Sequence, residues 1–338
     1  GRRKELFMTG VQTLTVAEKD DGLRLDRWFK AHFPGLSHVR LEKLLRTGQV
    51  RVNGGRVKAS RRIEAGETIR IPPIEAAPAP TAAAPPPRKD AAAFLRKITL
   101  FEDEHLLALN KPFGLAVQGG TKTREHVDGM LAALEKNGER PRLVHRLDAD
   151  TGGLLIIAKT RRAAAALSKS FQGRGVEKTY WALCAGAPEH REGSINLPIA
   201  KKMVWTRDGQ REQMAPAEDE EAKNALTDYM TLDGAGPVSF LALKPVTGRT
   251  HQLRVHCAAI GAPIVGDRKY GGPRARVEGV GEGLHLFCRS MTFPHPETGR
   301  SMTLTASLTG AMRTSFALFD FDADAKVVWP SMPWKKKK

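Results

Sequence analysis

A stretch rich in alanine and proline divides the sequence into two parts of very different size. It reads IEAAPAPTAAAPPPRKDAAA and runs from Ile74 to Ala93. Proline lacks a backbone donor and favours extended polyproline II geometry, and few of these side chains could pack in a core. We therefore expect a semi-rigid linker over residues 74–93. It would join a small N-terminal domain, residues 14–73, to a large domain, residues 94–319, which a basic C-terminal tail, residues 320–338, would follow.

The chain is strongly basic, with 54 Lys and Arg against 37 Asp and Glu and a formal net charge of +17. This balance favours a polyanionic partner, because neutralising phosphates releases counterions. A membrane surface is less favoured, since no basic amphipathic helix is evident and no apolar run approaches the roughly 20 residues that span a bilayer. The first residues lack the apolar stretch of a secretory signal. We expect a cytoplasmic protein that starts naturally at Met8 and acts as a monomer.

The small N-terminal domain has the pattern of two helices followed by a hairpin. Residues 23–33, LRLDRWFKAHF, place apolar side chains near helical spacing. Ser37 is suited to cap a second helix that Gly48 would end. The sequence QVRVNG then alternates polar and apolar residues and finishes in Asn53-Gly54, a strong hairpin turn signal. A last strand is expected at residues 66–72.

This domain is also where basic residues concentrate. Residues 36–72 contain nine Lys or Arg and three Glu, a net charge of +6. The pattern over residues 23–72 resembles the alpha-L RNA-binding motif of a small-subunit ribosomal protein and several RNA-modifying enzymes. The resemblance implies a small α/β RNA-binding domain whose candidate contacts are Arg40, Lys43, Arg46 and Arg51. The alternative is an ordinary solvated face on a structural domain.

The large domain alternates short strand-like runs with two helical patterns. The runs are LLALNKP, GGLLIIAKT, KTYWALCAG, TDYMTL and SFLALKPVTG, and the helical patterns cover residues 126–136 and 161–172. This order predicts an α+β fold with a mainly antiparallel mixed sheet and flanking helices rather than regular βαβ repeats. Cys184, Cys257 and Cys288 are far apart, so buried free thiols are expected rather than a disulfide framework or a zinc site. The histidines show no metal-ligand spacing, so no metal is expected.

The segment RLVHRLDADTGGLLIIAKT, residues 142–160, is the most informative. It places a polar turn before an apolar strand, and His145, Arg146, Asp148 and Asp150 crowd into that turn. An aspartate in a turn most often caps its own backbone. The segment alone therefore does not identify an active site.

Several motifs that occur in a fixed order do identify an active site. RLVHRLDADTGGLL resembles the H-R-L-D signature of the RluA family of pseudouridine synthases. The family's other motifs are resembled, in the same order, by residues 106–120 (LLALNKPFGLAVQGG), 177–186 (EKTYWALCAG), 245–271 (PVTGRTHQLRVHCAAIGAPIVGDRKYG) and 284–299 (LHLFCRSMTFPHPETG). The match covers residues 98 to about 306 and is most similar to the RluC branch, which modifies 23S ribosomal RNA. Gly152-Gly153 depart from the more usual Ser-Gly, which we interpret as a changed turn residue.

The resemblance implies the pseudouridine synthase catalytic fold and an isomerase without a cofactor. Asp148 would act either as a nucleophile at C1′ or as a base at C2′, and the sequence leaves both routes open. Arg249 would pair with Asp148 and hold the carboxylate ionised. Tyr180 would stack on the target base and assist removal of the C5 proton.

The target uridine must leave its stack, and the resemblance nominates Arg146 to stabilise the gap. His145 would either bind substrate or brace its loop through a hydrogen bond. A strand over residues 249–254 would send Arg249 and His251 to one face and Arg254 to the other, which favours a structural or RNA-facing role for Arg254. His251, in the same motif, is a further substrate-binding candidate. Further candidates for phosphate contacts are Lys201, Lys202, Arg268 and Lys269.

The expected partner is large-subunit (23S) ribosomal RNA or one of its assembly intermediates. Two other functions are compatible with parts of the sequence. A hydrolytic glycosidase could use Asp150 as a second carboxylic acid beside Asp148. A non-catalytic RNA-binding or ribosome-assembly factor would use the basic N-terminal domain and the basic tail. The combination of Asp148, Tyr180 and Arg249 favours the isomerase.

Overall fold

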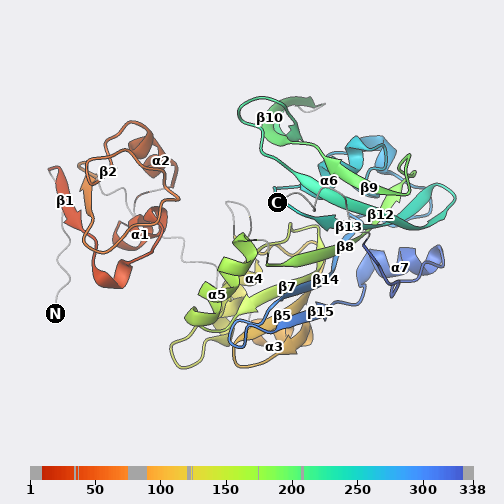
Figure 1. The fold of residues 1–338 in the computed structure, drawn as a ribbon, viewed down its shortest axis with the longest axis horizontal. Helices are drawn as coiled ribbons and strands as arrows, with labels where there is room; N and C mark the ends of the chain where they lie inside the picture. The colour runs from red at the N-terminus through yellow and green to blue at the C-terminus, as the bar shows by residue number, and fades with distance from the viewer. Residues whose placement is uncertain are drawn as a thin grey trace. The chain divides into compact units, whose positions relative to one another are not determined.

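A computed structural model describes residues 10–33, 36, 38–74, 90–119, 123, 125–173, 175–206 and 209–329. The chain divides into two compact units, residues 1–84 and 85–338, and each has its own hydrophobic core (Figure 1). Ser37, most of the expected linker (residues 75–89) and residues 330–338 lie outside the described residues. Within the described part of the chain, no helix is long and apolar enough to cross a membrane.

The N-terminal unit packs two helices against a small antiparallel sheet. Its elements are β1 (Gln12–Thr15), the 3-10 turn η1 (Glu18–Asp20), α1 (Leu25–His32), α2 (His38–Arg46), β2 (Arg51–Val52) and β3 (Thr68–Ile71), with strand order β1-β3-β2. Trp28 and Phe29 are each 1% exposed and share a core with Ile69 and Ile71. The two predicted helices and the last predicted strand are therefore present.

The predicted turn at Asn53-Gly54 is also present. Both residues have positive φ, 49° and 77°, as a type I′ turn requires. The amide of Val52 donates to the carbonyl of Gly55 at 3.1 Å, and the amide of Gly55 donates to the carbonyl of Val52 at 2.9 Å. The strand that pairs with β2 is β3, which lies further along the chain.

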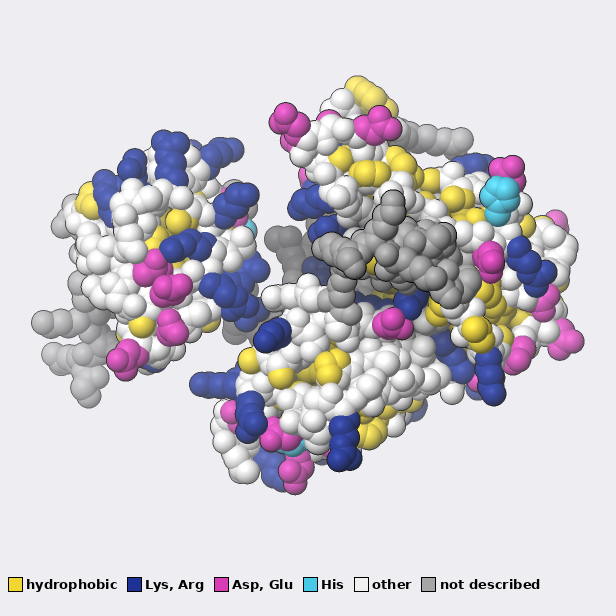
Figure 2. Space-filling model, viewed as in Figure 1, with side chains coloured by type: hydrophobic (Ala, Val, Ile, Leu, Met, Phe, Trp, Pro, Cys, Tyr) yellow, Lys and Arg dark blue, Asp and Glu magenta, His cyan; other side chains and the backbone are white. Residues whose placement is uncertain are grey.

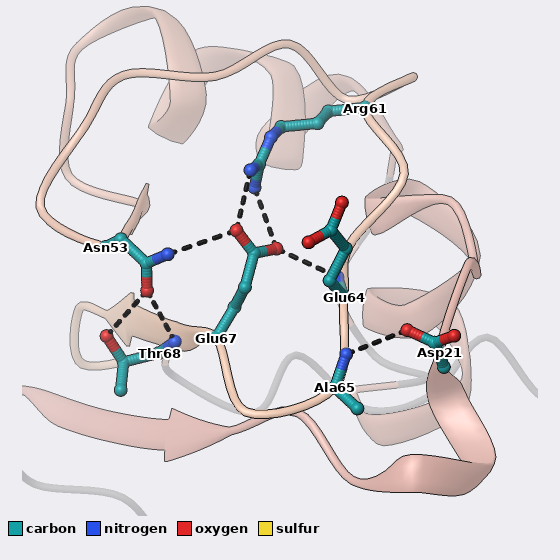
Figure 3. A network of polar contacts seen from close by, with 7 residues as sticks. All are labelled: Asp21, Asn53, Arg61, Glu64, Ala65, Glu67 and Thr68. Carbon is teal, nitrogen blue, oxygen red and sulfur yellow. Dashed lines mark hydrogen bonds and ion pairs between the residues drawn. The ribbon is translucent and has the colours of Figure 1, made fainter.

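Glu67 ties this turn to the rest of the unit (Figure 3). Its carboxylate accepts hydrogen bonds from Arg61 at 2.6 and 3.1 Å, from Asn53 Nδ2 at 3.1 Å and from the Glu64 amide at 2.9 Å. The bond from Arg61 lowers the pKa of Glu67, so this carboxylate stays ionised. Arg61 thus stabilises the domain internally, and this removes one cation from the surface available to RNA.

The large unit is built on a ten-stranded sheet. Its order is β4-β5-β7-β14-β8-β13-β12-β9, with β6 paired to β7 and β15 paired to β14. The strands are β4 (Thr99–Glu102), β5 (Leu106–Lys111), β6 (Arg142–Leu143), β7 (Gly152–Ala158), β8 (Glu177–Ala185), β9 (Glu192–Asn196), β12 (Leu226–Ala235), β13 (Val238–Pro245), β14 (Leu286–Pro294) and β15 (Ser301–Thr305). Among these described strands, β7 and β14 pair in parallel and the other neighbours are antiparallel. The predicted α+β fold with a mainly antiparallel mixed sheet is confirmed.

Helices cover both ends of this sheet (Figure 1). Near β5 and β7 lie α3 (Ala91–Lys97), α4 (Val127–Met130) with the 3-10 turn η2 (Leu131–Leu134), and α5 (Arg161–Gln172). Thr160 caps α5 by accepting a hydrogen bond from the Ala163 amide at 3.1 Å. Near β12 and β13 lie α6 (Gln252–Ala259) and the hairpin of β10 (Ile199–Thr206) and β11 (Gly209–Pro216). The remaining helices are the 3-10 turn η3 (Gly272–Ala275) and α7 (Gly310–Leu318).

Two boundaries drawn from composition are wrong. The helix α3 begins at Ala91, inside the expected linker, and its Ala91 and Leu95 are 1% and 0% exposed in the core of the large unit. Alanine suits both a linker and a helix, so composition could not separate them. Residues 320–329 do not form a free tail. Phe321 is 7% exposed in the same core, and the indole of Trp181 donates to the carbonyl of Ala323 at 2.9 Å.

The expected strand over residues 249–254 is wrong as well. The chain turns at His251 and continues as α6, which is buried from Gln252 to Cys257. A helix enclosed on all sides carries no apolar stripe, so its sequence lacks the helical period. The two faces that strand alternation assigned to Arg249 and Arg254 therefore do not apply.

Gly152 and Gly153 form the start of β7 rather than a turn. Gly153 has a φ of +105°, and a Cβ there would lie 2.3 Å from the carbonyl oxygen of Cys288. This is the point where β7 and β14 pair in parallel. A Cβ at Gly152 would lie 2.8 Å from the ring of Phe113. Backbone approach therefore requires Gly153, and the ring of Phe113 fills the space beside Gly152.

The three cysteines are buried free thiols, as predicted.

Candidate functional site

A pocket of about 540 Å³ opens where the loop before β7, the start of β8, the end of β13 and the start of α6 converge. Its lining contains five of the residues nominated from the sequence: Arg146, Asp148, Tyr180, Arg249 and His251. Asp148 is the one carboxylate among the described residues that line it. Asp150 is exposed and is not part of this lining.

The loop that carries Asp148 contributes consecutive residues to the pocket. Arg146, Leu147 and Asp148 all line it, and Leu147 is only 5% exposed. His145 lies behind the loop, where its Nε2 accepts a hydrogen bond from the Ile156 amide at 2.8 Å. Its ring also stacks on Phe171, with 4.4 Å between the centroids. Burial, with a further contribution from Lys178, lowers the pKa of His145 well below its usual value. The neutral imidazole thus braces the loop.

Lys111, at the end of β5, anchors the same loop through hydrogen bonds to backbone carbonyls. Its side chain is fully buried, and its ammonium donates to the carbonyls of Pro112, Leu115 and Ala149 at 2.9, 2.8 and 2.9 Å. Ala149 directly follows Asp148, so this contact fixes the backbone beside the carboxylate. Burial lowers the pKa of Lys111 to about 8, although the negative charges of Asp150 and Asp148 act to raise it.

The side chain that lies beside Asp148 is that of His251 rather than that of Arg249. His251 Nε2 lies 3.6 Å from Asp148 Oδ2, and His251 Nδ1 lies 2.6 Å from the Tyr270 hydroxyl. Arg249 instead donates from Nε to the carbonyl of Asn224 at 3.2 Å. No ion pair between Arg249 and Asp148 occurs in the described structure, so the pairing expected from the motif is not formed here.

His251 reaches this position through its backbone. It has a φ of 55° and sits in the left-handed conformation at the start of α6, which is uncommon for a residue other than glycine. Such strain often persists at functional sites, where the surroundings over-determine it. Burial lowers the pKa of His251 although nearby Asp148 opposes this. The imidazole is therefore neutral near pH 7.

Buried polar contacts lock the segment around His251. Gln252 Oε1 accepts from the Arg249 amide at 3.1 Å and from Thr247 Oγ1 at 2.7 Å. Arg254 forms a two-point ion pair with Asp267, at 2.9 and 2.7 Å, and its guanidinium lies 5.0 Å from the centre of the Tyr270 ring. Arg254 thus stabilises the wall that holds Tyr270 and makes no direct contact with Asp148.

Tyr180 and Lys178 form the opposite wall, on β8. Tyr180 is 8% exposed and pairs with Cys288 of β14 in the sheet. Burial raises the pKa of Tyr180 well above its usual value, so the phenol is protonated. Lys178 and Tyr270 were not predicted from the sequence, although both lie within segments that resemble the family's motifs. Lys178 could have been found, because strand alternation places it on the same face as Tyr180.

The other candidates for phosphate contacts differ in their surroundings, and several have an acidic partner. Lys201 lies 3.5 Å from Glu212, Lys202 pairs with Asp219, and Arg268 lies 2.9 Å from Glu282. In the N-terminal unit, Lys and Arg side chains gather over α2 and β2 (Figure 2). Lys43 and Arg46 are exposed there, whereas Arg51 donates to the carbonyls of Gly48 and Gly54 at 2.9 and 3.2 Å.

Comparison with known proteins fits both units. A family model described as RNA pseudouridylate synthase matches residues 105–259, and an S4 domain model matches residues 23–69. The chain is 33% identical over 308 residues to ribosomal large subunit pseudouridine synthase C of Salmonella typhimurium, covering 90% of this chain and 95% of that protein. The chain belongs to the RNA pseudouridine synthase family. The motif resemblance and the predicted enzyme class are thereby confirmed.

Further members of the family are similar to this chain in sequence and in structure. The Pasteurella multocida pseudouridine synthase C is 35% identical over 323 residues, with 92% of this chain and 94% of that protein covered. The solved structure of human RNA pseudouridylate synthase domain containing 4 is 28% identical, with a TM-score of 0.56 over 68% of this chain and 95% of that one. In this pseudouridine synthase, the pocket residues from Arg146 to Arg254 all fall within the matched residues 105–259.

Proposed function

We propose that this enzyme converts specific uridines of 23S ribosomal RNA to pseudouridine, with Asp148 as the catalytic carboxylate. The target RNA follows from the large-subunit relatives named above. The observation that carries the catalytic assignment is that Asp148 is the one carboxylate among the described residues lining the pocket. A two-carboxylate glycosidase would need a second acid, and Asp150 lies outside this lining.

The chemistry begins when the N1–C1′ bond breaks and the base rotates so that C5 can join C1′. Asp148 supports this step either by bonding to C1′ or by removing the C2′ proton. Both routes need an ionised and aimed carboxylate. When the Tyr270 hydroxyl donates to His251 Nδ1, the neutral imidazole carries its proton on Nε2, which faces Asp148. His251 is then a donor that orients the carboxylate.

Three other pocket residues have distinct parts in this proposal. The phenol of Tyr180 stays protonated, which suits stacking on the base more than acting as a phenolate. Arg146 is exposed, and among the described residues it has no hydrogen bond or ion pair, so its guanidinium can enter the gap left by the flipped uridine. Arg249 would exchange its contact with Asn224 for Asp148 when RNA fills the pocket.

The N-terminal unit would hold the RNA backbone while the pocket acts. We assign phosphate contacts to Arg40, Lys43, Arg46 and Arg51, consistent with the basic surface over α2 and β2 (Figure 2). In this proposal the enzyme works as a monomer in the cytoplasm, on ribosomal RNA or on an assembly intermediate.

Primer extension after carbodiimide treatment tests the proposal directly. The template is 23S RNA from cells that lack the gene and carry either wild type or Asp148→Asn. We expect stops that return with wild type alone, at positions that define the target uridines. Stops restored by both proteins would show that Asp148 is not essential. No change in any lane would refute the 23S target.

A further inference from the structure

A lysine ammonium lies in the pocket without a charged partner. Lys178 lines the pocket together with Asp148 and Tyr180. Among the described residues, no hydrogen bond or ion pair engages its Nζ, and its recorded contact is with the ring of Phe171, 5.1 Å from the centroid. Lys201, Lys202 and Lys244, in contrast, each have an acidic partner. An unpaired cation in a concave site points to a ligand with negative charge.

The strand fixes where this ammonium points. Lys178 and Tyr180 are two residues apart on β8, so their side chains project to the same face, and Thr179 between them does not line the pocket. The neighbouring strand β14 pairs with this segment, with Cys288 opposite Tyr180 and Met291 opposite Lys178. The ammonium therefore sits beside the phenol that walls the pocket.

Pseudouridine formation creates a negative charge at such a place. When the N1–C1′ bond breaks, its electron pair stays with N1, and the uracil fragment becomes an anion delocalised over O2 and O4. This holds whether Asp148 bonds to C1′ or removes the C2′ proton. A donor fixed beforehand where charge develops stabilises the transition state more than the ground state.

We propose that Lys178 is a further catalytic residue, whose ammonium stabilises the departing uracil anion through a carbonyl oxygen. This inference rests on the proposed function. A phosphate contact is less favoured, because Lys178 is partly enclosed beside Tyr180, whereas Lys43 and Arg46, to which we assign phosphates, are exposed. Burial lowers the pKa of Lys178, which makes its ammonium a stronger hydrogen-bond donor.

The test uses the full chain under single-turnover conditions. The substrate is an RNA fragment that carries the target uridine, and a second fragment carries 5-fluorouridine there. Lys178→Met removes the charge at similar volume, and Lys178→Gln keeps a neutral donor. Lys244→Met is the matched control, because Lys244 pairs with Glu177 at 2.9 Å beside β8 but does not line the pocket. Melting curves verify that each variant is folded.

We expect Lys178→Met to slow cleavage of the glycosidic bond roughly 10²-fold, the usual loss for one such donor. The affinity for RNA should stay near that of wild type, and Lys178→Gln should be intermediate. The loss should shrink on 5-fluorouridine, because fluorine itself stabilises the uracil anion. Lys244→Met should keep the wild-type rate.

Other outcomes would overturn the inference. A wild-type rate in Lys178→Met would do so, as would an equal loss on both substrates. Weaker binding with a smaller salt slope and an unchanged rate would assign Lys178 to a phosphate instead. Failure of wild type to form pseudouridine would overturn the proposed function and the inference together, whereas full activity of Lys178→Met would overturn the inference alone.

Discussion

His251 Nε2 lies 3.6 Å from Asp148 Oδ2, while the guanidinium of Arg249 donates to the carbonyl of Asn224. A neutral imidazole therefore occupies the position beside the carboxylate that the motif suggested for an arginine. The Tyr270 hydroxyl, 2.6 Å from Nδ1, fixes the orientation of that imidazole.

Replacing His251 with Ala should lower the single-turnover rate about 10- to 100-fold, because Asp148 loses the polar group, 3.6 Å away, that orients its carboxylate. Tyr270→Phe should give a smaller loss, since the imidazole remains but is less well oriented. RNA affinity, measured by filter binding, should change little in both variants. A wild-type rate in His251→Ala would show that the imidazole does not orient Asp148 during the reaction.

Gly153→Ala should destabilise the large unit severely. Its positive φ is unfavourable for alanine, and the new Cβ would meet the backbone of Cys288 at 2.3 Å, where no flexible side chain can yield. Gly114→Ala is the control, because Gly114 also has a positive φ, +82°, but has no neighbour within 4 Å. The control should lose only about 1 kcal/mol in chemical denaturation. Equal losses at the two positions would mean that strand packing at Gly153 is unimportant.

Lys111 predicts a pH dependence of stability. Its pKa is about 8 in the folded protein against 10.5 ordinarily, so between these values the unfolded chain binds more protons. The free energy of unfolding contributed by Lys111 therefore increases as pH rises through this window, by up to roughly 3 kcal/mol. Denaturation of wild type and Lys111→Met from pH 7 to 10 should show the difference between them shifting in favour of wild type. A constant difference would contradict the lowered pKa.

The exposed cations on α2 should determine the salt dependence of RNA binding. A double Lys43→Ala, Arg46→Ala variant should bind more weakly, and its log–log salt slope should decrease by about 0.7 to 0.9 per lost phosphate contact. Arg61→Ala is the matched control, because Arg61 already pairs with Glu67. The control should lower the melting temperature without changing the slope. An unchanged slope in the double variant would place the RNA elsewhere.

The sequence predicted which residues line the pocket better than it predicted how those residues contact one another. Arg146, Asp148, Tyr180, Arg249 and His251 all line it, because ordered motifs specify which residue types meet. The partners within the pocket could not be predicted in the same way. The buried start of α6 has no helical period, so a strand was expected there, and the motif paired Arg249 rather than His251 with Asp148.

The supporting contacts were harder still to predict. Lys111 binds backbone carbonyls, one of them 38 positions away at Ala149. Every residue has a backbone carbonyl, so the sequence does not indicate which of them will accept such a bond. Composition also failed at Ala91 and Phe321, where packing against the large core decided the outcome. His145 could be predicted only as one of two alternatives, because its acceptor role depends on the amide of Ile156.

The position of β14 has a consequence for synthesis of the enzyme. This strand, Leu286–Pro294, lies between β7 and β8, which follow the Asp148 loop and carry Tyr180. A growing chain that ends before residue 286 contains Asp148, Tyr180 and His251, yet it lacks the strand that separates and aligns their supports. Such distant pairing forms slowly, because the loop that it closes is long. The pocket can therefore assemble fully only after residues 286–294 have been synthesised, because β7 and β8 have no shared neighbour in the sheet before then.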